Sequence, residues 1–169
     1  PGLFLSQSSG PGRQTYSSRG FDIDNMMFDG LPSSYSGYAN SVQPNLAMFD
    51  RVEVIRGATG LVTGAGNPSA AINFVRKRPT ATPQVSITGA AGSWDDYRME
   101  LDASSALNDS GTLRGRVVGS YRDANSFRDN ETSDHGLFYA ISEADLSEDT
   151  TATLGFSRQE DQTTFFWGG

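Results

Sequence analysis

The segment from Phe49 to Pro79 constrains the fold of this 169-residue chain more than any other stretch. Apolar residues interleaved with charges over 51–56 predict a short, well-buried strand. A second apolar run over 70–75 predicts another strand, and a basic cluster at 76–78 follows it. Between the two strands the glycine density requires tight turns or close backbone approach, with glycines at positions 57, 60, 64 and 66.

Two simple interpretations of this glycine-rich loop can be compared. Nucleotide binding is disfavoured, because no Gly-Lys-Ser/Thr follows the glycines and the run Gly64–Ser69 lacks the third glycine of the dinucleotide pattern. A hairpin between two core strands explains the same residues as pure structure, and this interpretation stays open.

Longer motifs in the first half of the chain occur in an ordered series. The central segment reads RVEVIRGATG at 51–60, GNPSAAIN at 66–73 and RKRP at 76–79. Upstream, YSSRGF at 16–21 precedes DGLP at 29–32, where Asp-Gly is a strong turn signal. Taken together, these motifs resemble the plug domain of TonB-dependent outer-membrane transporters. They are most similar to the ferric-siderophore receptors of the ferripyoverdine, ferric-coprogen and ferrioxamine kind.

From Gln84 onward the chain alternates between apolar and polar residues. The alternation predicts five strands, which begin at Val85, Tyr97, Thr112, Leu137 and Thr150. A membrane barrel and a solvated antiparallel sheet both give this period of two. Short connections at 108–111 and 147–149 and a long polar one at 122–136 favour the barrel, with Trp94 and Tyr97 near its outer interface.

The predicted fold class is therefore mainly β, in two domains. Residues 1–82 are expected to form the C-terminal part of a plug domain, an α+β unit with a small mixed sheet. Residues 83–169 are expected to form the first antiparallel strands of a transmembrane β-barrel. Both ends of the sequence are expected to be cuts in a longer protein, because the first residues lack the features of a signal peptide and the chain stops abruptly at Trp167-Gly168-Gly169.

Composition narrows the functional classes. A formal charge of −7 argues against a nucleic-acid partner, and the absence of cysteine excludes disulfides and thiolate metal sites. The single histidine, His135, lies in a polar stretch and is expected to be a solvated loop residue. No Ser-His-Asp set, paired acid motif or metal-ligand spacing surrounds it, so an enzyme is not expected and no cofactor is predicted.

The resemblance implies a transporter in the cell outer membrane of a Gram-negative bacterium. Such a receptor takes up a ferric siderophore, is embedded in outer-membrane lipid and is energised by TonB through a TonB box, expected upstream of Pro1. Alternative cargoes are haem, cobalamin or a glycan. A soluble β-rich binding module is the alternative outside this class.

The resemblance also suggests site residues. Arg19 and Arg56 each precede a glycine at a strand end, and with Glu53 they are predicted to form a plug–barrel ion-pair network. For Glu53 an ordinary structural ion pair remains an equal alternative. Ligand contacts are predicted for Tyr35 and Tyr38 on an apical plug loop and for Trp167 at the end of the fifth strand. Arg78 is expected to be exposed.

Overall fold

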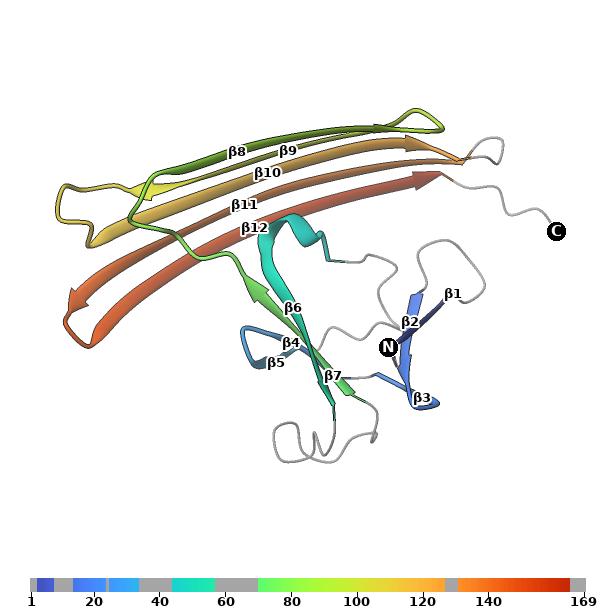
Figure 1. Ribbon diagram of the computed structural model, residues 1–169, viewed down its shortest axis with the longest axis horizontal. Helices are drawn as coiled ribbons and strands as arrows, with labels where there is room; N and C mark the ends of the chain where they lie inside the picture. The colour runs from blue at the N-terminus through green and yellow to red at the C-terminus, as the bar shows by residue number, and fades with distance from the viewer. Residues whose placement is uncertain are drawn as a thin grey trace. The chain divides into compact units, whose positions relative to one another are not determined.

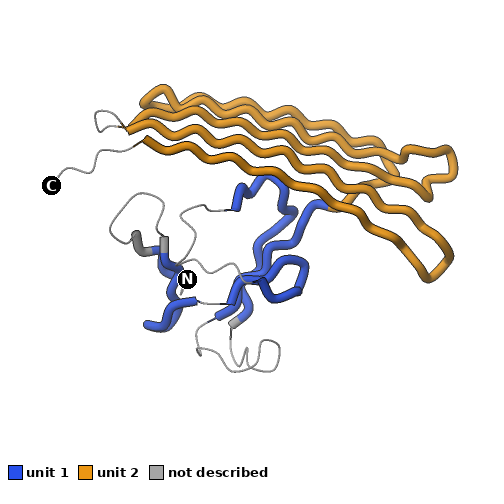
Figure 2. Tube along the Cα trace, turned by 180° about the vertical axis from the view of Figure 1, so that it is seen from behind, with its two compact units in different colours: residues 1–77 blue, residues 78–169 orange. Residues whose placement is uncertain are grey.

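A computed structural model describes residues 3–7, 14–23, 25–33, 44–56, 70–126 and 131–164 (Figure 1). The chain divides into two compact units, residues 1–77 and 78–169 (Figure 2). Regular structure in the described part consists of β-strands and one short 3-10 helix. No helix in this part is long and apolar enough to cross a membrane.

The first unit contains two small sheets. One has the order β1-β2-β3, and the other is a four-stranded sheet with the order β5-β4-β7-β6. In the second sheet β4 and β7 run parallel and the other neighbours are antiparallel, so the predicted small mixed sheet is present. The elements are β1 (Phe4–Gln7), β2 (Gln14–Ser18), β3 (Phe21–Asp22), β4 (Asn25–Phe28), β5 (Leu31–Ser33), the 3-10 helix η1 (Leu46–Met48), β6 (Phe49–Arg56) and β7 (Ala70–Arg76).

The turn between β4 and β5 forms where the sequence predicts it. Asp29 and Gly30 both have positive φ, 49° and 80°, and Phe28 pairs with Leu31 across the turn. Two consecutive positive φ angles match the strand twist of a two-residue hairpin. Aspartate tolerates this conformation and glycine adopts it without steric cost, which explains the Asp-Gly pair.

β7, not β6, is the buried strand of the mixed sheet. Phe74 on β7 packs against Phe28 and Phe49, with ring centroids 5.5 and 5.2 Å away. β6 lies at the sheet edge; its first residue, Phe49, is buried, but the apolar side chains that follow are exposed, Val52 by 44%, Val54 by 37% and Ile55 by 39%. The strand predicted over 51–56 is therefore present, but the prediction that it is well buried is wrong. An edge strand has a neighbour on one side only, which alternation alone does not reveal.

The second unit is a single antiparallel sheet with the strand order β12-β11-β10-β9-β8 (Figure 1). All five predicted strands are present, as β8 (Gln84–Gly92), β9 (Asp96–Ala106), β10 (Leu113–Asn125), β11 (Thr132–Ser147) and β12 (Thr150–Thr164). The predicted long loop at 122–136 is wrong, because β10 continues to Asn125 and β11 begins at Thr132, where the two strands pair. Polar side chains at these strand ends made them resemble a loop.

The sheet has one apolar and one polar face. Its register places even positions of β8, β9 and β10 on the same face as odd positions of β11 and β12. We call this the polar face; it also carries a buried apolar patch around Tyr139 and Ile141. The opposite, apolar face exposes large side chains: Val85, Ile87, Tyr97, Met99, Leu101, Val117, Tyr121, Phe138, Leu154 and Phe156.

The packing of β7 predicts where the first unit is most sensitive to mutation. Phe74→Ala removes a ring that is 5% exposed and should lower the opening free energy of the β7 amides by about 3–5 kcal/mol. Val54→Ala, on the exposed edge strand, should cost less than about 1 kcal/mol. Hydrogen exchange of β7 in the full-length protein measures both effects. Equal losses in the two variants would contradict the assignment of the core to β7.

Candidate functional site

Glu53 belongs to a chain of polar contacts within the first unit. Its Oε2 accepts a hydrogen bond from Nδ2 of Asn73 (2.9 Å), and its Oε1 accepts one from Nε of Arg51 (2.8 Å). Oδ1 of Asn73 in turn accepts the backbone N–H of Gly30 (2.9 Å). The bond from Asn73, and next that from Arg51, lower the pKa of the Glu53 carboxyl group. Asn73 therefore joins β6, β7 and the β4–β5 turn.

Asp29 fixes the same turn from its other side. Its carboxylate accepts the backbone N–H of Arg76 (2.9 Å) and the Nε–H of that residue (2.5 Å). Because Asp29 and Asn73 both hold the turn on β7, the polar residues in this region serve to position the β4–β5 hairpin. This favours a structural role for the contacts of Glu53 with Asn73 and Arg51.

The structure places only some of the predicted site residues. Arg19 lies in the exposed turn between β2 and β3, whereas Glu53 lies on β6 of the other sheet. The backbone of Arg56 ends β6, but its side chain lies outside the described residues, as do Tyr35, Tyr38 and Trp167. The plug–barrel ion-pair network and the ligand contacts therefore stay predictions.

A network of ion pairs occupies the polar face of the second unit, near the turns that precede β10 and β12. Arg114 donates two hydrogen bonds to Asp145, each of 2.8 Å, and its Nη2 lies 3.6 Å from Oε2 of Glu143. Oε1 of Glu143 accepts a hydrogen bond from Nη1 of Arg78 (2.9 Å). The Glu143 side chain is only 7% exposed, so these two arginines compensate a buried carboxylate.

A second buried pair lies beside the first. Arg116 donates from Nε and Nη2 to the two oxygens of Asp102, at 2.8 and 2.7 Å. Its Nη1 donates to the backbone oxygen of Arg78 (2.9 Å). Arg78 is thus held through both its guanidinium and its carbonyl, although its side chain is 66% exposed as the sequence suggested. The alternating polar residues of β10 and β11 were the sequence signal that could have pointed to these ion pairs. The contact with Arg78 could not be read from that pattern, because it depends on the register between distant strands.

His135 lies at the opposite end of the polar face and is not a loop residue. It sits in β11, where its Nδ1 contacts Asp161 on β12 and its Nε2 lies 2.5 Å from Oγ of Ser133. These three groups have the connectivity of an acyl-transfer triad. However, β11 pairs on both sides at Ser133, so the neighbouring backbone N–H groups serve the sheet and not an oxyanion hole. We interpret the group as a structural hydrogen-bond chain between two strands.

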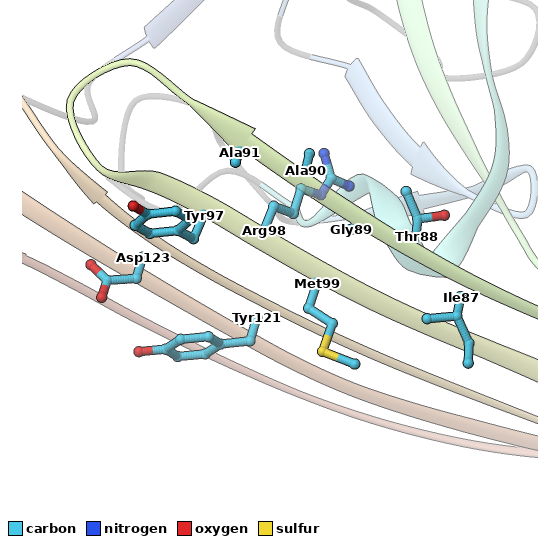
Figure 3. Close-up of a pocket in the computed structure, with 10 residues that line it drawn as sticks. All are labelled: Ile87, Thr88, Gly89, Ala90, Ala91, Tyr97, Arg98, Met99, Tyr121 and Asp123. Atoms are coloured by element: carbon cyan, nitrogen blue, oxygen red, sulfur yellow. The ribbon is translucent and has the colours of Figure 1, made fainter.

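A shallow furrow lies on the apolar face of the second unit (Figure 3). Its volume is about 570 Å³. Small residues of β8, including Gly89 and Ala91, lie beside the larger Tyr97, Met99 and Tyr121 of β9 and β10. Asp123 is the only carboxylate in its lining, so the furrow carries no catalytic or metal-binding set.

Comparison with known proteins gives a consistent result. The family model described as TonB-dependent Receptor Plug Domain matches residues 1–71. The ferric-pyoverdine BN7/BN8 receptor of Pseudomonas putida is 48% identical over 93% of this chain and 19% of that protein. The ferripyoverdine receptor of Pseudomonas aeruginosa is 44% identical over 95% of this chain and 20% of that protein. The chain thus spans about a fifth of the length of these relatives.

Solved structures agree with the sequence matches. The pyoverdine outer membrane receptor FpvA from Pseudomonas aeruginosa, bound to pyoverdine, superposes with a TM-score of 0.88 at 43% identity, over 96% of this chain and 24% of that chain. The alcaligin receptor FauA of Bordetella pertussis gives a TM-score of 0.83 at 39% identity, over 95% of this chain and 27% of that one. These matches confirm the predicted fold class of a plug followed by antiparallel barrel strands.

The motifs, the two-faced sheet and the matches lead to the same assignment. The chain belongs to the family of TonB-dependent receptors and resembles its ferric-siderophore members, with residues 1–71 matching the plug domain.

Proposed function

We propose that the protein containing this chain takes up a ferric siderophore across the outer membrane in a TonB-dependent manner. The observation that carries the proposal is the identity of 44–48% to two receptors named for ferric pyoverdine, over more than nine-tenths of the chain. A solved relative is an outer membrane receptor bound to pyoverdine. The transported ligand is an iron chelate, and no covalent chemistry is involved.

The two faces of the second sheet support a place in the outer membrane. Apolar side chains cover the middle of one face, where a barrel strand meets lipid. Asp123, Asp134 and Glu160 lie on this face toward the strand ends near the β8–β9 turn. Arg158 lies further from that turn, opposite Phe138, and pairs with Glu160. Exposed Trp94 and Tyr97 lie at the end with the β8–β9 turn, where interfacial aromatic residues are expected.

The polar face suits the wall of a plugged, water-containing lumen. Arginine and carboxylate side chains face this side and pair with one another across strands, as in Arg116–Asp102 and Arg114–Asp145. Paired charges tolerate burial far better than isolated ones. A wall of this kind accepts a plug without leaving uncompensated charge.

We further propose roles for the residues that the family resemblance suggested. Tyr35, Tyr38 and Trp167 would offer aromatic faces to a chelate whose iron is already coordinated by siderophore oxygens. Arg19 and Arg56 would join the plug to carboxylates of the barrel, and Glu53, whose two oxygens bind Asn73 and Arg51, would support this network from within the plug. TonB would act through a TonB box upstream of Pro1.

The membrane placement predicts that an introduced arginine destabilises the receptor on the apolar face but not on the polar face. Leu101→Arg, on the apolar face in the middle of β9, should destabilise the assembled receptor by about 2–4 kcal/mol. Thr88→Arg is the control, since Thr88 lies on the polar face opposite Glu100. Receptor abundance and heat-modifiable mobility in outer-membrane fractions measure the effect. Equal assembly of both variants would contradict a lipid-facing apolar side.

The ligand proposal predicts which aromatic side chains affect binding. Trp167→Ala or Tyr38→Ala should weaken ferric-siderophore binding by about 1–3 kcal/mol, because rigid aromatic side chains are common binding hot spots. Tyr121→Ala is the control, since Tyr121 is exposed on the apolar face. Equilibrium binding of a ferripyoverdine-type chelate to the full receptor, at matched abundance, gives the affinities. Unchanged affinity in both test variants would remove these residues from the site.

A further inference from the structure

The segment that leads into β8 is fastened to the polar face of the second sheet. We call residues 78–83 the strap. Thr80 donates its backbone N–H to Oγ of Ser104 on β9 (2.8 Å), and its own Oγ1 lies 3.0 Å from the same atom. The backbone N–H of Ala106 donates to the carbonyl of Ala81 (3.3 Å). The middle of the strap is therefore hydrogen-bonded to β9, to residues that lie far from it in the sequence.

The beginning of the strap is held by two further strands. The carbonyl of Arg78 accepts a hydrogen bond from Arg116 on β10, and its guanidinium donates to Glu143 on β11. Arg116 is itself oriented by its bidentate pair with Asp102. Charge-assisted bonds of this kind are stronger than neutral ones, and breaking a buried pair leaves an uncompensated charge. The strap thus has anchors on β9, β10 and β11.

The residue immediately before the strap has a different attachment. The backbone N–H of Lys77 donates to the carbonyl of Met48 (3.0 Å), and both residues belong to the first unit. The division between the two units falls between Lys77 and Arg78 (Figure 2). Pro79 then follows, buried and with a fixed φ, which stiffens the chain directly after the division. Attachment therefore changes from one unit to the other across a single peptide bond.

We infer that the strap is the fixed point of the transport cycle. This inference rests on the proposed function, since it concerns the displacement of the plug by TonB. Residues 78–83 stay bound to the barrel wall, and any movement of the plug is taken up at Lys77 or before it. Arg78, Arg116, Asp102, Glu143 and Ser104 act as positioning residues that hold this point.

Cross-linking the strap to the sheet tests the inference. A full-length receptor carrying T80C and S104C should form a disulfide in the outer membrane, because the two side-chain oxygens lie 3.0 Å apart. Ferric-siderophore uptake by the oxidised receptor should stay within about twofold of uptake by the reduced receptor. The single variants T80C and S104C are the matched controls. Failure of the disulfide to form would overturn the inference, because the contact that carries it would be absent.

The result also separates this inference from the proposed function. Loss of uptake on oxidation, with ferric-siderophore binding retained and uptake restored by reduction, would overturn the fixed strap alone. Absence of binding in the reduced receptor would contradict the proposed function.

A measurement that needs no ligand also tests whether the strap stays bound to the barrel wall. Thr82→Cys should react with a thiol reagent in the periplasm at the same rate in cells with and without working TonB. A TonB-dependent increase of that rate would overturn the inference.

Discussion

Compensation of buried charge on the polar face is the interaction on which the second unit depends. Glu143 and Asp102 are almost fully buried, and an arginine from another strand or from the strap compensates the charge of each carboxylate. The same pairs fix the register of β9, β10 and β11, since a slip of one residue would move every charge to the apolar face. Arginine suits this task because its guanidinium stays charged and binds carboxylates bidentately.

Local pattern predicted most of the fold. Period-two alternation located all five strands of the second sheet, and the Asp29-Gly30 pair located the β4–β5 turn. The polar ends of β10 and β11 were missed, because Thr132–His135 resembles a loop until its cross-strand partners are known. β6 was misjudged for a related reason: alternation does not distinguish an edge strand from a central one.

The candidate site was less predictable than the fold. Arg78 was recognised as exposed, yet its partner Glu143 lies 65 positions later in the sequence and is brought near only by the sheet register. His135 was likewise assigned to solvent, although Asp161 on the next strand binds it. Such contacts depend on strand pairing over long separations, which no short motif encodes. The plug motifs succeeded because they are continuous in sequence.

Uptake of ferric iron by whole cells tests the central claim most directly. Cells lacking other siderophore receptors and carrying the full-length protein would be supplied with radiolabelled iron as a ferripyoverdine-type chelate. The account predicts accumulation that requires both this receptor and a working TonB system, with surface binding alone when TonB is deleted. Equal accumulation with and without the receptor, or with and without TonB, would contradict the assignment as a TonB-dependent ferric-siderophore transporter.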